Sequence, residues 1–141
     1  MKRLFPALEV RFKSNKRLVS KARKLVQGYE GQKVTGPLPY VEVTCGSSDI
    51  ATRTFGADIE VYQLFFTIHT GRTQPSLADD IKELMIEVFD DANLLSADFK
   101  TVGCVRQSCS GPVLNDAVYD IEMAYEVIVQ WNVRRPAVKM L

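Results

Sequence analysis

One long segment near the C-terminus alternates between apolar and polar residues. In residues 118–133 the apolar positions recur every second residue: Tyr119, Ile121, Met123, Tyr125, Val127, Val129, Trp131 and Val133. Successive side chains of a β-strand point to opposite faces, so this pattern predicts a long strand with one apolar and one largely polar face. A chain with such a strand needs a sheet that is covered on one side only, and its other face meets water or a partner.

Three further segments favour strands. Residues 40–45 are β-prone and alternate, and residues 57–69 also alternate. Residues 99–109 favour a strand through Val102, Cys104 and Val105. Within 57–69, the apolar positions change face between Val61 and Tyr62, which indicates either a β-bulge or the true start of the strand. The polar stretch 46–56 is predicted to form a long loop or hairpin tip. Residues 110–117 are also predicted to be a loop, because Ser110-Gly111-Pro112 interrupts the strand before it.

Two segments have the three- and four-residue spacing of amphipathic helices. The first covers residues 5–26, with Pro6 in its first turn and Gly28 as its stop. The second covers residues 76–91, with Ser76 as its N-cap. Its apolar stripe comprises Leu77, Ile81, Leu84, Met85 and Val88.

The order of these elements is α-β-β-α-β-β. We therefore expect an α+β fold, with a mainly antiparallel four-stranded sheet and two helices packed on one face. The length of 141 residues fits a single domain over 1–141, with residues 1–4 and 134–141 as tails. We expect one core that joins the 76–91 stripe to one face of each long strand: Tyr62, Leu64, Phe66 and Ile68, and Ile121, Met123, Tyr125, Val127 and Val129.

Targeting signals and cysteine frameworks are not evident. No apolar run approaches the ~18–20 residues of a membrane helix, and no long apolar stretch follows the basic start at residues 1–6, so neither a membrane partner nor a secretory signal is expected. Cys45, Cys104 and Cys109 include no CxxC pair, and the one histidine is His69. This spacing favours reduced thiols over a disulfide framework or a zinc site.

Catalytic motifs are also lacking in the sequence. No glycine-rich segment follows a strand and opens a helix, so phosphate-cradle and dinucleotide sites are not predicted. Cys109 could act as a nucleophile only with His69 as its base, and nothing in the sequence places them together. The pairs Asp79-Asp80 and Asp90-Asp91 lie on one predicted helix, where adjacent residues do not face each other. We therefore expect no enzyme, no cofactor and no bound metal.

Charge is divided unevenly along the chain. Residues 1–24 carry nine of the 18 basic residues and one of the 17 acidic residues, so their net charge is +8 and that of the other 117 residues is −7. The 76–91 helix is acidic on the side away from its stripe. This division predicts an oppositely charged partner for the first helix: nucleic acid, an acidic protein surface or the acidic part of another copy of this chain.

The order of several short motifs is familiar. The basic first helix leads to GPLPYVEV at 36–43, then to GSSD at 46–49, then to FFTIHTGRTQPSLADDIKELM at 65–85, and the last strand ends with YEVIV at 125–129. Over residues 5–133 this order resembles the family of tail terminator, tail completion and head–tail joining proteins of long-tailed bacteriophages and prophages.

The resemblance implies an assembly protein without enzymatic activity. Such a subunit forms a six-fold ring in the tail or neck of the virion, caps the tail tube and joins it to the head connector. It assembles in the host cytoplasm, and packaged DNA passes nearby. The alternative from another class is a small basic nucleic-acid-binding domain. Charged residues are the candidates for subunit or partner contacts: Arg11, Lys13, Lys16, Arg17, Lys21, Arg23, Lys24, Arg53, Arg72, Asp80, Glu83, Glu87 and Asp90.

Overall fold

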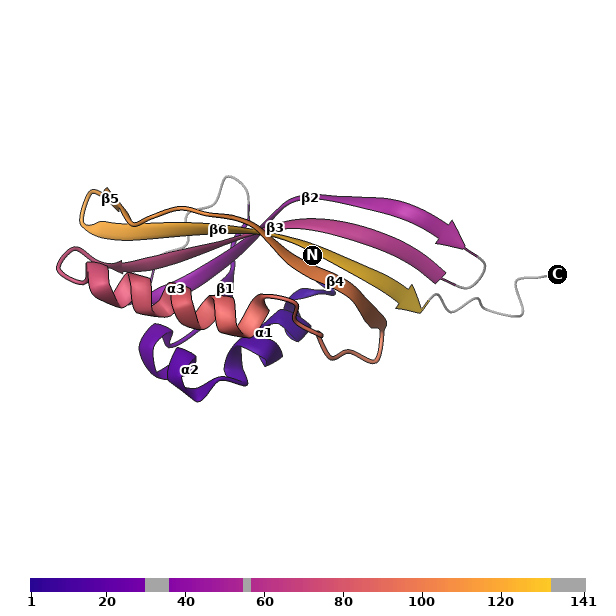
Figure 1. Ribbon diagram of the computed structural model, residues 1–141, viewed down its shortest axis with the longest axis horizontal. Coiled ribbons are helices and arrows are strands. Elements are labelled where there is room, and N and C mark those ends of the chain that lie inside the picture. The colour runs from indigo at the N-terminus through magenta and orange to yellow at the C-terminus, as the bar shows by residue number, and fades with distance from the viewer. Residues whose placement is uncertain (30–35, 55–56, 133–141) are drawn as a thin grey trace.

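The computed structural model describes residues 1–29, 36–54 and 57–132. In chain order its elements are α1 (Phe5–Lys13), α2 (Lys16–Ala22), β1 (Leu25–Gln27), β2 (Tyr40–Thr54), β3 (Ala57–Gly71), α3 (Pro75–Phe89), β4 (Phe99–Cys109), β5 (Val113–Asn115) and β6 (Val118–Asn132). The strands form one sheet in the order β1-β2-β3-β6-β4, and β5 pairs with β6 beyond the end of β4. All three helices lie on one face of this sheet, and no helix of the described residues covers the other face, which is called the open face below (Figure 1).

The predicted fold, a mainly antiparallel four-stranded sheet with two helices, is wrong. The sheet has six strands and is mixed, because β1 pairs with β2 in parallel, and three helices cover it. The two unexpected strands, β1 and β5, contain three residues each. A strand this short shows too few alternating positions to be distinguished from a helix end or a loop in the sequence.

The first predicted helix is in fact two helices followed by a strand. Asn15 caps α2, and its side chain accepts a hydrogen bond from the backbone N–H of Leu18 at 3.0 Å. Arg23 then takes a φ of 68°, a left-handed conformation that ends α2. The chain then enters β1. Two backbone hydrogen bonds hold this strand to β2: Val41 N–H donates to Lys24 O, and Gly28 N–H donates to Val43 O. The apolar stripe hid these breaks because both helices and β1 bury residues in one core.

The segment 46–56, predicted to be a long loop or hairpin tip, is strand as far as Thr54, and residues 55–56 lie outside the described residues. β2 continues to Thr54 and pairs with β3 down to Ala57. The irregularities predicted for β3 belong to β2, between Cys45 and Ser47 and between Ile50 and Thr52, whereas β3 pairs with β6 without interruption. The apparent change of phase arises because Ile59 and Val61 lie on the open face. The β2–β3 hairpin extends beyond the helical layer there (Figure 1).

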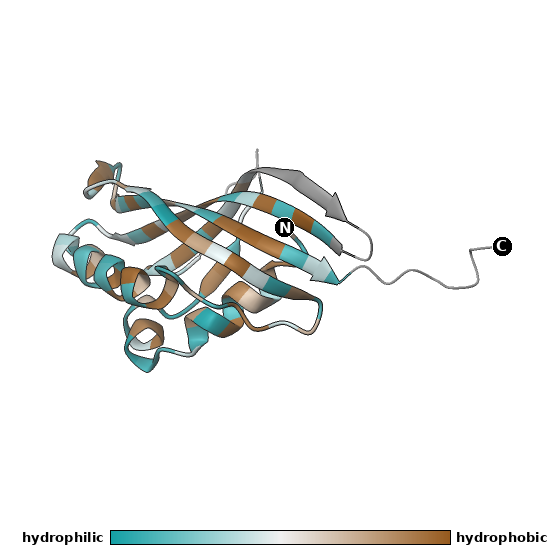
Figure 2. Cartoon of the chain, turned by 45° about the vertical axis from the view of Figure 1, so that its right-hand side comes forward, coloured by the Kyte–Doolittle hydropathy of each residue, from teal (hydrophilic) through white to brown (hydrophobic). Residues whose placement is uncertain are grey.

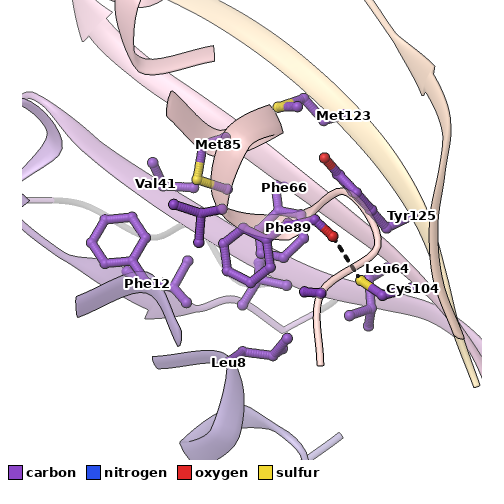
Figure 3. Close-up of a cluster of buried hydrophobic side chains, with 14 of the residues drawn as sticks. Leu8, Phe12, Val41, Leu64, Phe66, Met85, Phe89, Cys104, Met123 and Tyr125 are labelled. Carbon is purple, nitrogen blue, oxygen red and sulfur yellow. Dashed lines mark hydrogen bonds between the residues drawn. The ribbon is translucent and has the colours of Figure 1, made fainter. Parts of the chain in front are cut away.

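The predicted core is confirmed. Tyr62, Leu64, Phe66 and Ile68 of β3 are buried, as are the predicted residues of β6 and, from α3, Ile81, Leu84, Met85 and Val88; Leu77 is half-buried. Brown apolar residues alternate with teal polar ones along the strands in Figure 2. The ring centroid of Phe66 lies 4.8 Å from that of Phe89 and 5.5 Å from that of Tyr125, whose ring it meets edge to face (Figure 3). Burying each such side chain contributes about 1.5–3 kcal/mol.

Residues 1–4 and 134–141 were predicted to be tails at the two ends of the chain. Instead, Leu4 is fully buried, and the guanidinium of Arg3 lies 4.1 Å from the Trp131 ring centroid. Residues 134–141 lie outside the described residues.

The start of α3 differs from the prediction, which made Ser76 its N-cap. The helix begins at Pro75 with Gln74 as its N-cap, so Ser76 lies within the helix. Proline fits this first position because its missing N–H has no helical partner there.

Candidate functional site

The basic and acidic helices contact each other within one chain. Arg17 of α2 forms an ion pair with Glu87 of α3 at 3.2 Å, and Lys21 lies 3.8 Å from Asp80. Arg11 of α1 donates from Nε to the backbone oxygen of Val88 at 2.9 Å. Part of the division of charge seen in the sequence is therefore balanced within the chain itself.

The other predicted contact residues are dispersed around this helical surface. Lys13 is exposed and lies 3.8 Å from Glu9, and Lys16 is exposed at the start of α2. Two shallow hollows lie between α2 and α3, of about 380 Å³ beside Lys16 and about 310 Å³ beside Glu83. They are lined by charged side chains, which suits a hydrated surface rather than an apolar ligand pocket.

The remaining predicted residues lie away from the contact of α2 with α3. Arg23 and Lys24 are exposed where α2 leads to β1, and Arg72 is exposed in the turn after β3. Arg53 belongs to the part of β2 whose side chains are not among the described ones. The structure therefore does not bring all the candidates together in one patch.

Asp90 holds the end of α3 against the sheet. Its carboxylate accepts a hydrogen bond from Tyr125 Oη at 2.6 Å and from Arg106 Nε at 3.2 Å. Burial, followed by this hydrogen bond, raises the pKa of the Tyr125 hydroxyl. Asp90 thus has two partners within its own chain, and this geometry assigns it a structural role.

A row of polar side chains crosses the open face of the sheet. His69 of β3 lies between two carboxylates, with Nδ1 2.6 Å from Asp120 Oδ1 of β6 and Nε2 3.1 Å from Glu42 Oε1 of β2. Asn115 of β5 donates from Nδ2 to the second oxygen of Asp120 at 2.9 Å. The row therefore spans four strands. The sequence did not reveal it, because Glu42 and Asp120 are 27 and 51 positions from His69.

The cysteines are not placed for nucleophilic chemistry. Cys109 pairs with Met123 on the helix-facing side, whereas His69 pairs with Asp120 on the open side, so the sheet separates them. Cys104 donates from Sγ to the backbone oxygen of Phe89 at 3.1 Å, as the dashed line in Figure 3 shows. Burial raises the pKa of the Cys104 thiol to about 11, which keeps it protonated near neutral pH.

Within residues 1–29, 36–54 and 57–132, no three histidine, cysteine or acidic side chains gather in a group that could hold a metal ion. The helices of the same residues include none with the length and apolarity required to span a membrane.

Exposed apolar side chains are concentrated at one edge of the sheet. Among the described residues, seven large apolar side chains are exposed, and five of them belong to β4, β5 or the segment before β4: Leu95, Val102, Val105, Val113 and Leu114. β4 and β5 form the outer edge beyond β6. Sequence reasoning missed this edge, because it placed β5 in a loop and could not tell which strand lay outermost.

Solved structures of other proteins share the fold of this chain. No family model matches the chain, and no curated protein matches it. A chain of the virion of a native gene transfer agent particle matches with a TM-score of 0.63 and 15% identity, over 85% of this chain and 89% of that one. A second solved structure matches with a TM-score of 0.58 and 16% identity, over 95% and 99% of the two chains. At these identities the comparisons show a shared fold.

Proposed function

We propose that this chain is a structural subunit of a phage or phage-like particle. The observation that carries the proposal is the fold shared with a chain of a gene transfer agent virion, which extends over most of both chains. The described surface agrees with it, because it offers an open sheet face, an apolar sheet edge and charged helices rather than an enclosed pocket.

Within that class, the proposed role is that of a tail terminator or completion protein. The subunits form a ring that caps the tail tube and joins it to the head connector, and the ring catalyses no reaction. The resemblance of GPLPYVEV at 36–43 and of residues 65–85 to that family supports this finer role. A ring needs two different, complementary surfaces on each subunit, and the chain has unlike edges on the two sides of its sheet.

The ion pairs of α2 favour this role over that of a nucleic-acid-binding domain. A phosphate-binding surface needs Lys and Arg side chains that are free to meet phosphate groups. Arg17 and Lys21, which would be central to such a surface, face Glu87 and Asp80 of the same chain.

The test is recruitment to tail tubes. Labelled full-length protein is mixed with purified tail tubes of the phage or prophage that encodes it, and separately with duplex DNA. We expect binding at tube ends, visible by electron microscopy, and no comparable binding to DNA. Binding to DNA that falls steeply with salt, without binding to tubes, would instead identify a nucleic-acid-binding domain.

A further inference from the structure

We infer that neighbouring copies of this chain meet edge to edge, with the β1 edge of one copy against the β4–β5 edge of the next. The β1 edge is defined here by Arg23, Lys24 and Tyr29, and the β4–β5 edge by Val113, Leu114 and Asp116. This inference rests on the proposed ring, and it names the surfaces that would form the ring contact. The occupant of each edge is therefore a second copy of the chain.

The β4–β5 edge has the composition of an interface. Val113 and Leu114 expose 52% and 44% of their surface, and Val105 of β4 exposes 52%. Within the described chain, no strand pairs with the outer side of β4 or β5. Unpaired strand edges bind other strands, and exposed apolar side chains beside such an edge favour association. Asp116 follows β5 and is exposed, with a φ of 54°.

The β1 edge is basic, whereas Asp116 on the β4–β5 edge is acidic. Arg23 and Lys24 are exposed directly before β1, and Tyr29, which follows it, exposes 55% of its surface. Tyrosine and arginine are the residue types enriched at the centres of protein interfaces. β1 is also the last strand of the sheet on this side among the described residues.

The two edges lie at the same level of the sheet. Residues paired in register on neighbouring strands lead straight across the sheet. One such line runs from Tyr40 of β2, next to β1, through His69 and Asp120 to Val113 of β5. A second line of paired residues runs from Val43 of β2 through Phe66 and Met123 to Cys109 of β4. β1 is therefore level with the junction between β4 and β5 on the opposite side.

Strand direction and charge then fit a head-to-tail contact. β1 is parallel to β2, β2 and β6 are both antiparallel to β3, and β5 is antiparallel to β6, so β1 and β5 run in opposite directions. A neighbour moved along the sheet without being turned over brings these two strands together in antiparallel orientation. The same movement brings Arg23 and Lys24 towards Asp116. Unlike surfaces that meet in this way form a closed ring when the rotation between copies closes.

The test is a charge swap in the full-length chain, measured by light scattering across a range of concentrations. Lys24→Glu and Asp116→Lys each place like charges across the contact, so each variant should self-associate about tenfold or more weakly than the original chain. Combining both substitutions should restore association. Lys16→Glu makes the same change of charge on α2, away from both edges, and should leave association unchanged. Thermal melting checks that each variant is folded.

Each outcome decides the inference. Loss with either single variant and recovery with the double variant supports it. Association that is unaffected by both single variants, or lost only with Lys16→Glu, places the contact elsewhere and overturns it. A chain that stays monomeric at every concentration also overturns it. Recruitment to tail tubes is measured separately, so the proposed function can stand or fail independently of this contact.

Discussion

The thiol of Cys104 makes the stability of the fold depend on pH. An unfolded chain releases this proton at its ordinary pKa near 9, whereas burial raises the pKa in the folded chain to about 11. The unfolded state therefore loses its proton first, and the contribution to stability is full below pH 9 and is lost as pH rises to about 11. A change of this size corresponds to about 2–3 kcal/mol.

We expect the free energy of unfolding to fall between pH 9 and 11, and to fall less steeply in Cys104→Ala. Urea unfolding of both proteins across this range measures the two slopes. Tyr62 and Tyr125, whose pKa values burial also raises, contribute to the fall in both proteins and cancel in the comparison. Parallel profiles for the two proteins would show that the thiol ionises equally in the folded and unfolded chains.

A second prediction concerns the hydroxyl of Tyr125. Tyr125→Phe keeps the buried ring but removes the 2.6 Å hydrogen bond to Asp90. Hydrogen bonds to charged groups contribute about 1.5–3 kcal/mol, so the free energy of unfolding should fall by that amount. Asp90 keeps Arg106 as its partner, so no buried charge is left alone. In the Asp90→Asn background the same substitution should cost less, and an equal cost in both backgrounds would contradict the assigned bond.

Burial of single residues was predictable from the sequence, whereas their polar partners were not. The faces of β3, β6 and α3 follow from periodicity alone, and Ile81 and Tyr125 lie in one core as expected. The neighbours of His69 depend on which strands are adjacent and on their register. Periodicity within one segment contains neither quantity.

Among the elements, the junction of α1 and α2 provides a third prediction. Asn15→Ala removes the side-chain oxygen that caps α2, so we expect the free energy of unfolding to fall by about 1 kcal/mol. Ser14→Ala is the matched control, because Ser14 is exposed and its hydroxyl donates only to Arg11 O of the preceding turn. Chemical unfolding of the two variants should separate them, and equal values would show that the Asn15 cap does not stabilise α2.

Long elements were predictable and short ones were not. The limits of β4 and β6 follow the sequence pattern closely, whereas β1, β5 and the distal half of β2 were missed. β1 and β5 are formed by pairing with a longer neighbour, and each has only three residues of its own. The distal half of β2 has a loop-like composition, but its backbone pairs with β3 as far as Thr54 despite two register shifts. Tertiary pairing overrides local preference in these places.

For the whole molecule, the sequence showed that the basic and acidic residues are unevenly divided, but not that the basic side chains of α2 pair with acidic side chains of α3. Opposite charges on α2 and α3 predicted contacts with other molecules, yet two of these side-chain pairs form within the chain. The packing of α2 beside α3 on one face of the sheet creates these pairs, and neither this packing nor the sheet order can be seen in the sequence. The edges that carry the proposed subunit contact depend on the same order, so the sequence alone could not locate them.

The last prediction is that apolar burial, rather than these ion pairs, holds the helical layer on the sheet. Leu18 of α2 is fully buried, whereas the Arg17 and Glu87 side chains are 70% and 57% exposed. We expect Leu18→Ala to lower the free energy of unfolding by about 2–5 kcal/mol. Arg17→Ala should lower it by less than about 1 kcal/mol, because water screens exposed pairs. Urea unfolding at low and high sodium chloride tests both. If high salt destabilised the original chain as much as Leu18→Ala does, the ion pairs would be its main support.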